Sequence, residues 1–122
     1  MRIMVIDDDD QMRVLLRQVM EWAGYEVVEA EDGREGMQIQ RRQPADLVIT
    51  DLIMPEQEGL ETIGLLRKEF PRTRIIAISG GGRIGPEAYL PAAQELGADR
   101  VFSKPFDVRE LAGAVKELLG HG

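Results

Sequence analysis

The residues best suited to do chemistry in this sequence are aspartates that follow short apolar runs. Asp7 and Asp8 open a run of four aspartates directly after the apolar residues 3–6, and Asp51 follows the apolar run 47–50. Each carboxylate raises the cost of ionising its neighbours, so three of them in one small site would need a cation. The chain has no cysteine and its one histidine lies next to the last residue. Every candidate ligand is therefore an oxygen.

An oxygen-only ligand set favours a hard divalent cation, Mg²⁺ or Mn²⁺. A carboxylate beside such an ion can also attack phosphorus and form an aspartyl phosphate. Ser79 and Lys104 follow two further apolar runs, and a hydroxyl and an ammonium suit the equatorial oxygens of a transferring phosphoryl group. We expect Asp51 to be the nucleophile because it stands alone, whereas the adjacent Asp7 and Asp8 suit metal binding.

The alternation of apolar runs with segments of helical period predicts the elements that must position these residues. Five strands and five helices are expected in one α/β domain, residues 1–122, with parallel strands and helices on both faces. In such a doubly wound sheet, ligands bind beyond the carboxyl ends of the strands, which is where the candidate residues lie. The expected strands are 3–6, 25–30, 47–50, 74–78 and 99–102, and the expected helices include 60–70, 87–96 and three that begin near Asp10, Asp32 and Asp107.

The limits of the first helix can be placed from local signals. Asp10, with Asp9 as a second candidate, is expected to be the N-cap of this helix. Gly24 is expected to close it. Trp22, near its end, is expected in the core or at the core margin.

Composition excludes several classes of function. The chain has 122 residues and a net charge of −7, which disfavours a large surface for nucleic acid or an anionic membrane. The absence of cysteine excludes disulfides and thiolate metal sites. No stretch approaches the length of a membrane helix, and the apolar run before Asp7 is too short for a signal peptide. We therefore expect a cytoplasmic protein.

Four motifs together resemble the receiver domain of two-component response regulators, over essentially the whole chain. They are VIDD (5–8) with Met12-Arg13, DLIMP (51–55) with Gly59, ISG (78–80) and KPF (104–106). Each motif is weak alone, but the set is highly specific because each follows its own expected strand. The resemblance also supplies part of the expected flavodoxin-like strand order, 2-1-3-4-5.

The resemblance implies a phospho-acceptor and a metal site. Asp51 would accept a phosphoryl group from a phosphohistidine on a sensor histidine kinase or a histidine phosphotransfer protein. Asp8, Asp51 and the backbone carbonyl of Ile53 would bind Mg²⁺ directly, and Asp7 would help through water.

The resemblance also implies a conformational switch. Ser79 and Lys104 would contact the phosphoryl oxygens, and Ser79 and then Phe102 would move inward. Many members have tyrosine where this chain has Phe102, so we expect a different coupling to the output. The expected partner is a downstream protein, with the face of helix four, strand five and helix five as its candidate surface. A homodimer that forms on phosphorylation is a further alternative. No nucleic acid or membrane is expected as a direct partner.

Two other classes of function are weighed against this interpretation. A pseudo-receiver would be an interaction module that never turns over phosphate, but the set of acidic pair, acceptor, hydroxyl and lysine is complete. An aspartate-dependent phosphatase usually has a second acid two residues after its nucleophile, where this chain has Ile53, and it also needs a cap domain. We therefore expect a signalling switch that catalyses its own phosphorylation and dephosphorylation, rather than a turnover enzyme.

Overall fold

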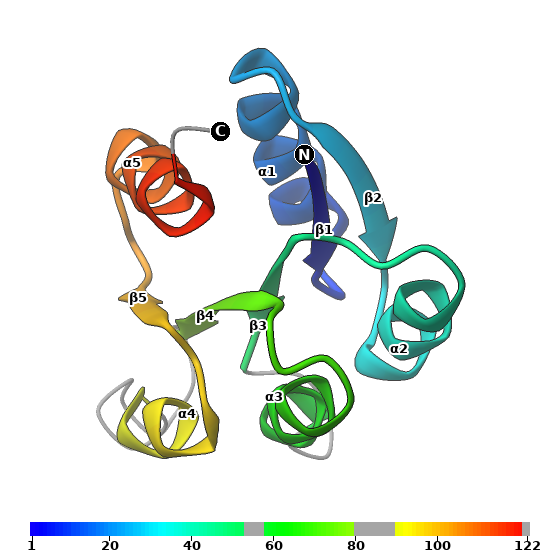
Figure 1. Ribbon diagram of the computed structural model, residues 1–122. Helices are drawn as coiled ribbons and strands as arrows, with labels where there is room; N and C mark the ends of the chain where they lie inside the picture. The colour runs from blue at the N-terminus through cyan, green and yellow to red at the C-terminus, as the bar shows by residue number, and fades with distance from the viewer. Residues whose placement is uncertain (53–57, 80–89, 121–122) are drawn as a thin grey trace.

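Five strands and five helices alternate along the part of the chain that the structure describes, as the sequence predicts (Figure 1). The structure is a computed structural model that describes residues 1–52, 58–79 and 90–120. The elements are β1 (Arg2–Ile6), α1 (Asp10–Trp22), β2 (Glu26–Ala30), α2 (Gly33–Arg42), β3 (Leu47–Asp51), α3 (Glu58–Glu69), β4 (Arg74–Ser79), α4 (Leu90–Leu96), β5 (Arg100–Ser103) and α5 (Val108–Leu119). The strand order is β2-β1-β3-β4-β5 and all pairings are parallel, which confirms the expected doubly wound topology.

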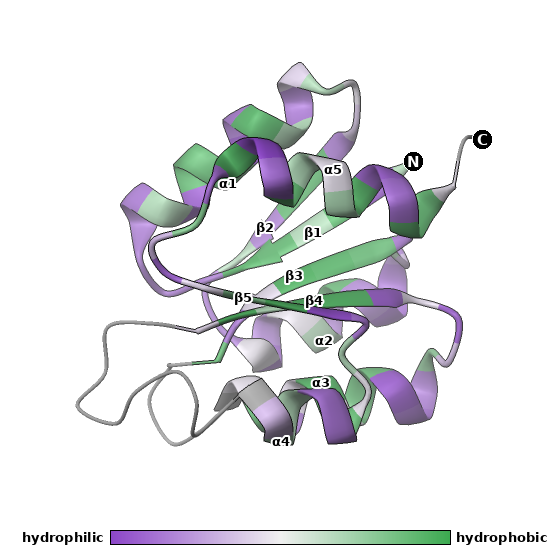
Figure 2. Cartoon of the chain, turned by 90° about the vertical axis from the view of Figure 1, so that its left-hand side faces the viewer, coloured by the Kyte–Doolittle hydropathy of each residue, from purple (hydrophilic) through white to green (hydrophobic). Residues whose placement is uncertain are grey.

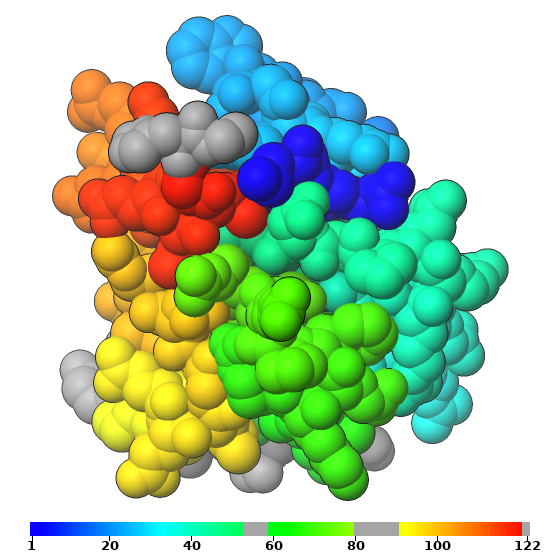
Figure 3. All heavy atoms as spheres, in the orientation of Figure 1, coloured from blue at the N-terminus to red at the C-terminus, as the bar shows by residue number. Residues whose placement is uncertain are grey.

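Helices cover both faces of the sheet. Helices α1 and α5 lie on one face, and α2, α3 and α4 lie on the other (Figure 2). On β1, Ile3 and Val5 belong to the core beneath α1 and α5, whereas Met4 and Ile6 belong to the opposite core. Because both faces are covered, the inner strands are apolar at almost every position. Side chains fill the spaces between the ribbons, as the space-filling view in the same orientation shows (Figure 3).

The N-cap of α1 is Asp9, so the expectation of Asp10 is wrong by one residue. Asp9 has an extended backbone, and its carboxylate accepts hydrogen bonds from the N–H groups of Gln11, at 3.0 Å, and Met12, at 3.4 Å. Asp10 is the first helical residue, where its charge still favours the positive end of the helix dipole. The two neighbours have identical side chains, and the turn of the backbone decides which of them caps the helix.

Trp22 is 91% exposed, so the expectation that it belongs to the core is wrong. The buried residues of α1 are Leu16 and Met20. Trp22 follows Met20 by two residues, which places it about 200° around the helix, on the side away from the sheet. Gly24 follows with a φ of 99°, a left-handed conformation that favours glycine, and confirms the expected end of this helix.

The other element limits agree with the sequence to within about two residues where the structure describes them. Asp32 caps α2 by accepting from the Glu35 N–H at 2.8 Å, and Asp107 caps α5 by accepting from the Arg109 N–H at 2.8 Å. Helix α4 is described from its first residue, Leu90, and the expected residues 87–89 lie outside the described part. Within the described ranges, no helix combines the length and apolar character needed to cross a bilayer.

Candidate functional site

The three aspartates singled out by the sequence come together at the carboxyl edge of the sheet. Asp7 follows β1, Asp8 is the next residue, and Asp51 ends β3. One oxygen from each carboxylate lies within 4.8 Å of the others. Asp7 and Asp51 are only 1% and 5% exposed, whereas Asp8 is exposed. The site therefore combines two buried acidic groups with one that solvent reaches.

The register of the sheet explains why Asp7 and Asp51 meet. Ile6 pairs with Thr50 across β1 and β3, so the residues that follow them, Asp7 and Asp51, lie at the same level of the sheet edge. The Asp7 N–H also donates to the carbonyl of Ala30 at 3.1 Å, which extends the contact between β1 and β2 by one residue. Two residues that are 44 positions apart are thereby placed side by side by strand pairing alone.

Burial makes Asp7 costly to ionise. Loss of solvent raises the pKa of Asp7 from 3.8 to about 6, and the negative charge of Asp51 adds to the rise. The hydrogen bond from the Asp9 N–H, at 2.9 Å, and the charge of Lys104 act in the opposite direction. A cation bound between these carboxylates would remove the same cost.

Lys104, the first residue after β5, faces this acidic cluster. Its Nζ lies 3.2 Å from Oδ2 of Asp51. Its backbone N–H donates to the carbonyl of Ser79 at 2.8 Å, which ties the loop after β5 to the end of β4. The bond between Lys104 and Pro105 is cis. The predicted lysine is therefore at the predicted acceptor, already paired with it.

Ser79 ends β4, which pairs with β3, the strand that carries Asp51. In the register of β3 and β4, Asp51 pairs with Ile78, so Ser79 is the next residue along. Its hydroxyl is fully buried and makes no hydrogen bond with any residue that the structure describes. Buried polar groups are nearly always satisfied, so the unpaired Ser79 hydroxyl, one register position from Asp51, is suited to bind an oxygen atom of a ligand.

Helix α3 comes very close to the end of β3 at Gly59. A Cβ atom on Gly59 would lie 2.4 Å from the Asp51 carbonyl oxygen and 2.7 Å from Cα of Leu52. Both neighbours are backbone atoms, which cannot move aside as a side chain can. Gly59, which accompanies the DLIMP motif, is therefore required by packing at the site itself.

Two predicted residues are not brought to the site by the described structure. Ile53 lies outside the described residues, so the metal contact expected from its carbonyl stays a prediction. Phe102 is half-buried on β5, and its ring lies 6.2 Å from that of Phe106 at an interplanar angle of 57°. The switching role expected of Phe102 also stays a prediction.

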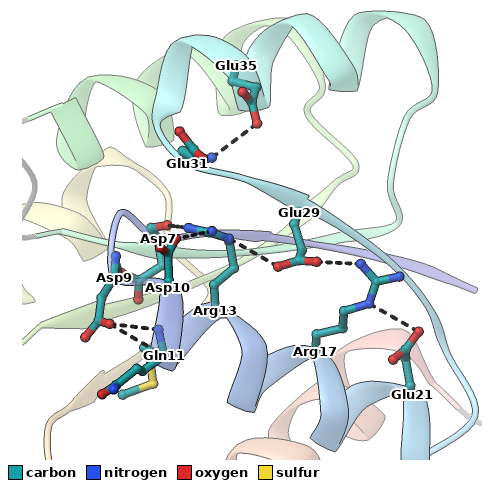
Figure 4. A network of polar contacts seen from close by, with 11 residues as sticks. Asp7, Asp9, Asp10, Gln11, Arg13, Arg17, Glu21, Glu29, Glu31 and Glu35 are labelled. Atoms are coloured by element: carbon teal, nitrogen blue, oxygen red, sulfur yellow. Dashed lines mark hydrogen bonds and ion pairs between the residues drawn. The ribbon is translucent and has the colours of Figure 1, made fainter.

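One residue of the site was quoted from the sequence only as part of a motif and was given no role. Arg13, on α1, donates a hydrogen bond to the backbone carbonyl of Asp7 at 2.6 Å. It also contacts Asp10 and Glu29 (Figure 4). The available signal was an arginine one turn into the helix that follows the acidic run, but its partner on β2 could not be read from the sequence.

Comparisons with known proteins identify the family. A model of the response regulator receiver domain matches residues 3–116. The chain is 30% identical to sporulation initiation phosphotransferase F of Bacillus subtilis, over 97% of this chain and 93% of that protein. It is 31% identical to a probable chemotaxis protein CheY of Rhizobium etli, over 98% and 92%. It is also 30% identical to the transcriptional regulatory protein CpxR of Escherichia coli K12, of which it covers 49%.

Solved structures agree with this assignment. A CheY-like receiver domain protein from Methanospirillum hungatei superposes with a TM-score of 0.87 at 29% identity, covering 97% of this chain and 92% of the other. A receiver domain protein from Clostridium thermocellum gives 0.87 at 28% identity, covering 97% and 93%. The strand order, the site at the carboxyl edge and these matches lead to one conclusion: the chain belongs to the response regulator receiver domain family.

Proposed function

We propose that this chain is a Mg²⁺-dependent switch of two-component signalling that accepts a phosphoryl group on Asp51. The donor would be a sensor histidine kinase or a histidine phosphotransfer protein. The observation that carries the proposal is the cluster of Asp7, Asp8 and Asp51 within 4.8 Å, with the Lys104 ammonium 3.2 Å from Asp51. Positioning and electrostatic stabilisation are nearly all that a protein must supply for phosphoryl transfer.

The donor set fits a hard divalent cation. All three side chains offer carboxylate oxygens, which Mg²⁺ prefers and Mn²⁺ accepts. Asp8 and Asp51 would hold the ion directly and Asp7 through water, and the Ile53 carbonyl completes the proposed set. When bound, the ion supplies positive charge to the oxygens of the incoming phosphoryl group.

The chain's own residues would carry out the transfer. A carboxylate oxygen of Asp51 attacks phosphorus, and the bond from phosphorus to the imidazole nitrogen of the donor breaks. Lys104 donates to one phosphoryl oxygen. Ser79, whose buried hydroxyl has no hydrogen-bond partner among the described residues, donates to another. The same groups would serve hydrolysis, in which water attacks phosphorus, the bond from phosphorus to the Asp51 oxygen breaks and inorganic phosphate leaves.

The output would follow from these new contacts. A modification shifts a two-state protein only through interactions that differ between the two states. The phosphoryl group supplies such a difference at Ser79 and Lys104, and Phe102 would follow Ser79 inward. The proposed output surface is the face of α4, β5 and α5, offered to a downstream protein or to a second copy of the chain, in the cytoplasm.

A pseudo-receiver is not favoured, because every group that the chemistry needs is present. One oxygen from each of the three carboxylates lies within 4.8 Å of the others, and the Lys104 ammonium lies 3.2 Å from Asp51. Incubation with acetyl phosphate and Mg²⁺, followed by intact-mass measurement, separates the alternatives. We expect a gain of one phosphoryl group that needs the metal and is lost in Asp51→Asn. No gain in the wild-type protein would support the pseudo-receiver, and multiple turnover of small phosphoesters would support a phosphatase.

Asp8 and Asp9 offer a matched pair of variants for the same assay. Asp8→Asn should abolish metal-dependent phosphorylation, since Asp8 belongs to the carboxylate cluster. Asp9→Asn removes an equal charge one residue away, yet asparagine still caps a helix well. It should leave phosphorylation nearly intact. Equal losses in the two variants would mean that general acidity, rather than a defined metal site, supports the reaction.

A further inference from the structure

The guanidinium of Arg13 joins three separate parts of the chain. Its Nη1 donates to the Asp7 carbonyl at 2.6 Å, its Nε donates to Oε1 of Glu29 at 3.1 Å, and its Nη2 contacts the Asp10 carboxylate (Figure 4). These acceptors belong to the loop after β1, to β2 and to the first turn of α1. The Arg13 side chain is only 11% exposed. It is therefore held in one geometry rather than extended into solvent.

Asp7 is fixed at every polar group it has. Its N–H donates to the Ala30 carbonyl at 3.1 Å, its carbonyl accepts from Arg13 at 2.6 Å, and its carboxylate accepts from the Asp9 N–H at 2.9 Å. Of these three contacts, only the one from Arg13 comes from a side chain of another element. Removing it would leave a carbonyl without its partner at the point where the acidic pair begins.

Glu29 anchors the arrangement to β2. One of its oxygens accepts from Arg13, and the other accepts from Arg17 at 2.5 Å. Arg17 also pairs with Glu21 one turn further along α1, at 3.3 Å. Figure 4 shows Arg17 on the side of Glu29 that faces away from Asp7. Arg17 thus shares the partner of Arg13 and lies on the same helix, but no contact of Arg17 with the loop is seen among the described residues.

We propose that Arg13 is a positioning residue for the metal site. It holds the Asp7 carbonyl against β2 through Glu29, and it thereby sets where the Asp7 and Asp8 carboxylates lie relative to Asp51. Arg13 touches neither a metal ion nor a phosphoryl group in this arrangement. The inference rests on the proposed function, because it concerns the affinity of the same site for Mg²⁺.

The planar fork of the guanidinium is needed for this role. Arginine presents several N–H donors in fixed directions, so one side chain can serve three acceptors at once. A lysine would carry the same charge but would donate from a single nitrogen. Without the fork, the acidic loop would have to be ordered when the cation binds, and that ordering would weaken the affinity.

The test compares Mg²⁺ affinity, by isothermal titration calorimetry, among wild type, Arg13→Ala, Arg13→Lys and Arg17→Ala. Groups that support metal ligands commonly change affinity by about 10- to 100-fold. We expect Arg13→Ala to weaken Mg²⁺ binding by roughly tenfold or more, and Arg13→Lys to restore little of it. Arg17→Ala should stay within about twofold of wild type, because it breaks an ion pair on Glu29 without touching Asp7.

A second readout needs no metal. Amide hydrogen exchange at Asp7 and Asp9, measured by NMR in the presence of a chelator, should accelerate in Arg13→Ala and not in Arg17→Ala. The amides of β3 should be unchanged in both variants. If Arg13→Ala does not fold by circular dichroism, Arg13→Lys carries the comparison, since it keeps the charge and the side-chain length.

The outcomes separate the two proposals. Equal Mg²⁺ affinity and equal exchange in the Arg13 and Arg17 variants would overturn the positioning role. If the wild-type protein binds no Mg²⁺, the proposed function fails, and the positioning role, which is defined by that affinity, fails with it. If the wild-type protein binds Mg²⁺ and Asp8→Asn abolishes binding while Arg13→Ala does not change it, only the positioning role fails.

Discussion

The Lys104 ammonium lies 3.2 Å from the Asp51 carboxylate, although 53 residues separate the two in the sequence. Strand β4 lies between β3, which ends with Asp51, and β5, which Lys104 follows, so the lysine reaches past the end of β4 to meet the aspartate. The backbone of Lys104 is held there by its hydrogen bond to the Ser79 carbonyl. Asp51, the proposed acceptor, therefore has a cation beside it in the unphosphorylated protein.

Replacing this cation should slow phosphorylation. In Lys104→Met, we expect the rate of phosphoryl gain from acetyl phosphate to fall by about 10²-fold, the usual effect of removing one preorganised donor from a transition state. Time-resolved intact-mass measurement gives the rate. Lys116→Met, on the exposed side of α5, changes net charge equally and should be neutral. A similar loss in both variants would assign the effect to net charge.

Ser79→Ala should separate stability from function. The Ser79 hydroxyl is buried and has no hydrogen-bond partner among the described residues, so its removal should change the free energy of unfolding by no more than about 1 kcal/mol. Phosphorylation by acetyl phosphate should slow by about tenfold or more, since one donor to the phosphoryl group is lost. Urea unfolding and the mass assay measure the two quantities.

The control for Ser79 is its sheet partner. Ser103 pairs with Ser79 across β4 and β5 but is exposed. Ser103→Ala should affect neither quantity. A large loss of stability in Ser79→Ala would show that the hydroxyl has a structural partner and would remove the reason for assigning it to the phosphoryl group.

Asp7 should make the metal-free protein less stable as pH rises. Its pKa is raised from 3.8 to about 6, so between about pH 4 and pH 6 the folded state binds more protons than the unfolded state. The contribution of Asp7 to the free energy of unfolding therefore falls between about pH 4 and pH 6 and is constant at higher pH. The full cost at pH 8 is about 3 kcal/mol, at 1.36 kcal/mol for each pKa unit.

Asp7→Asn removes this cost and keeps an oxygen to accept from the Asp9 N–H. In urea unfolding with a chelator, the variant should be more stable than wild type at pH 8 by about 2–3 kcal/mol, and nearly equal at pH 4. Saturating Mg²⁺ should stabilise the wild type more than the variant. A variant that is less stable than wild type at pH 8 without metal would contradict this account.

Gly59→Ala should displace α3 from the end of β3. The new methyl group would lie 2.4 Å from the Asp51 carbonyl oxygen, and we expect a loss of about 2–3 kcal/mol in the free energy of unfolding with slower phosphorylation. Gly64, on the same helix, is the matched control, because the nearest atom to its Cβ would be 3.9 Å away. Gly64→Ala should stabilise by about 0.5–1 kcal/mol. Similar effects at both positions would mean that helix propensity, and not the close approach, is being measured.

The sequence alone was enough to predict the five-stranded parallel sheet. It was also enough to predict that Asp7, Asp8, Asp51 and Lys104 lie close together. The reason is that period and composition are local properties, and parallel strands collect their carboxyl ends at one edge whatever the loops between them do. The caps at Asp32 and Asp107 were equally readable, because an N-cap bonds to N–H groups only two or three residues away.

Other features depended on neighbours that only the folded chain brings close. Asp9 rather than Asp10 caps α1 because of where the backbone turns, and Trp22 is exposed because α1 buries its other side. The link from Arg13 through Glu29 crosses from α1 to β2, and the raised pKa of Asp7 comes from burial among distant residues. Long-range contacts and desolvation depend on which distant residues pack around a side chain, and a local sequence pattern does not show this.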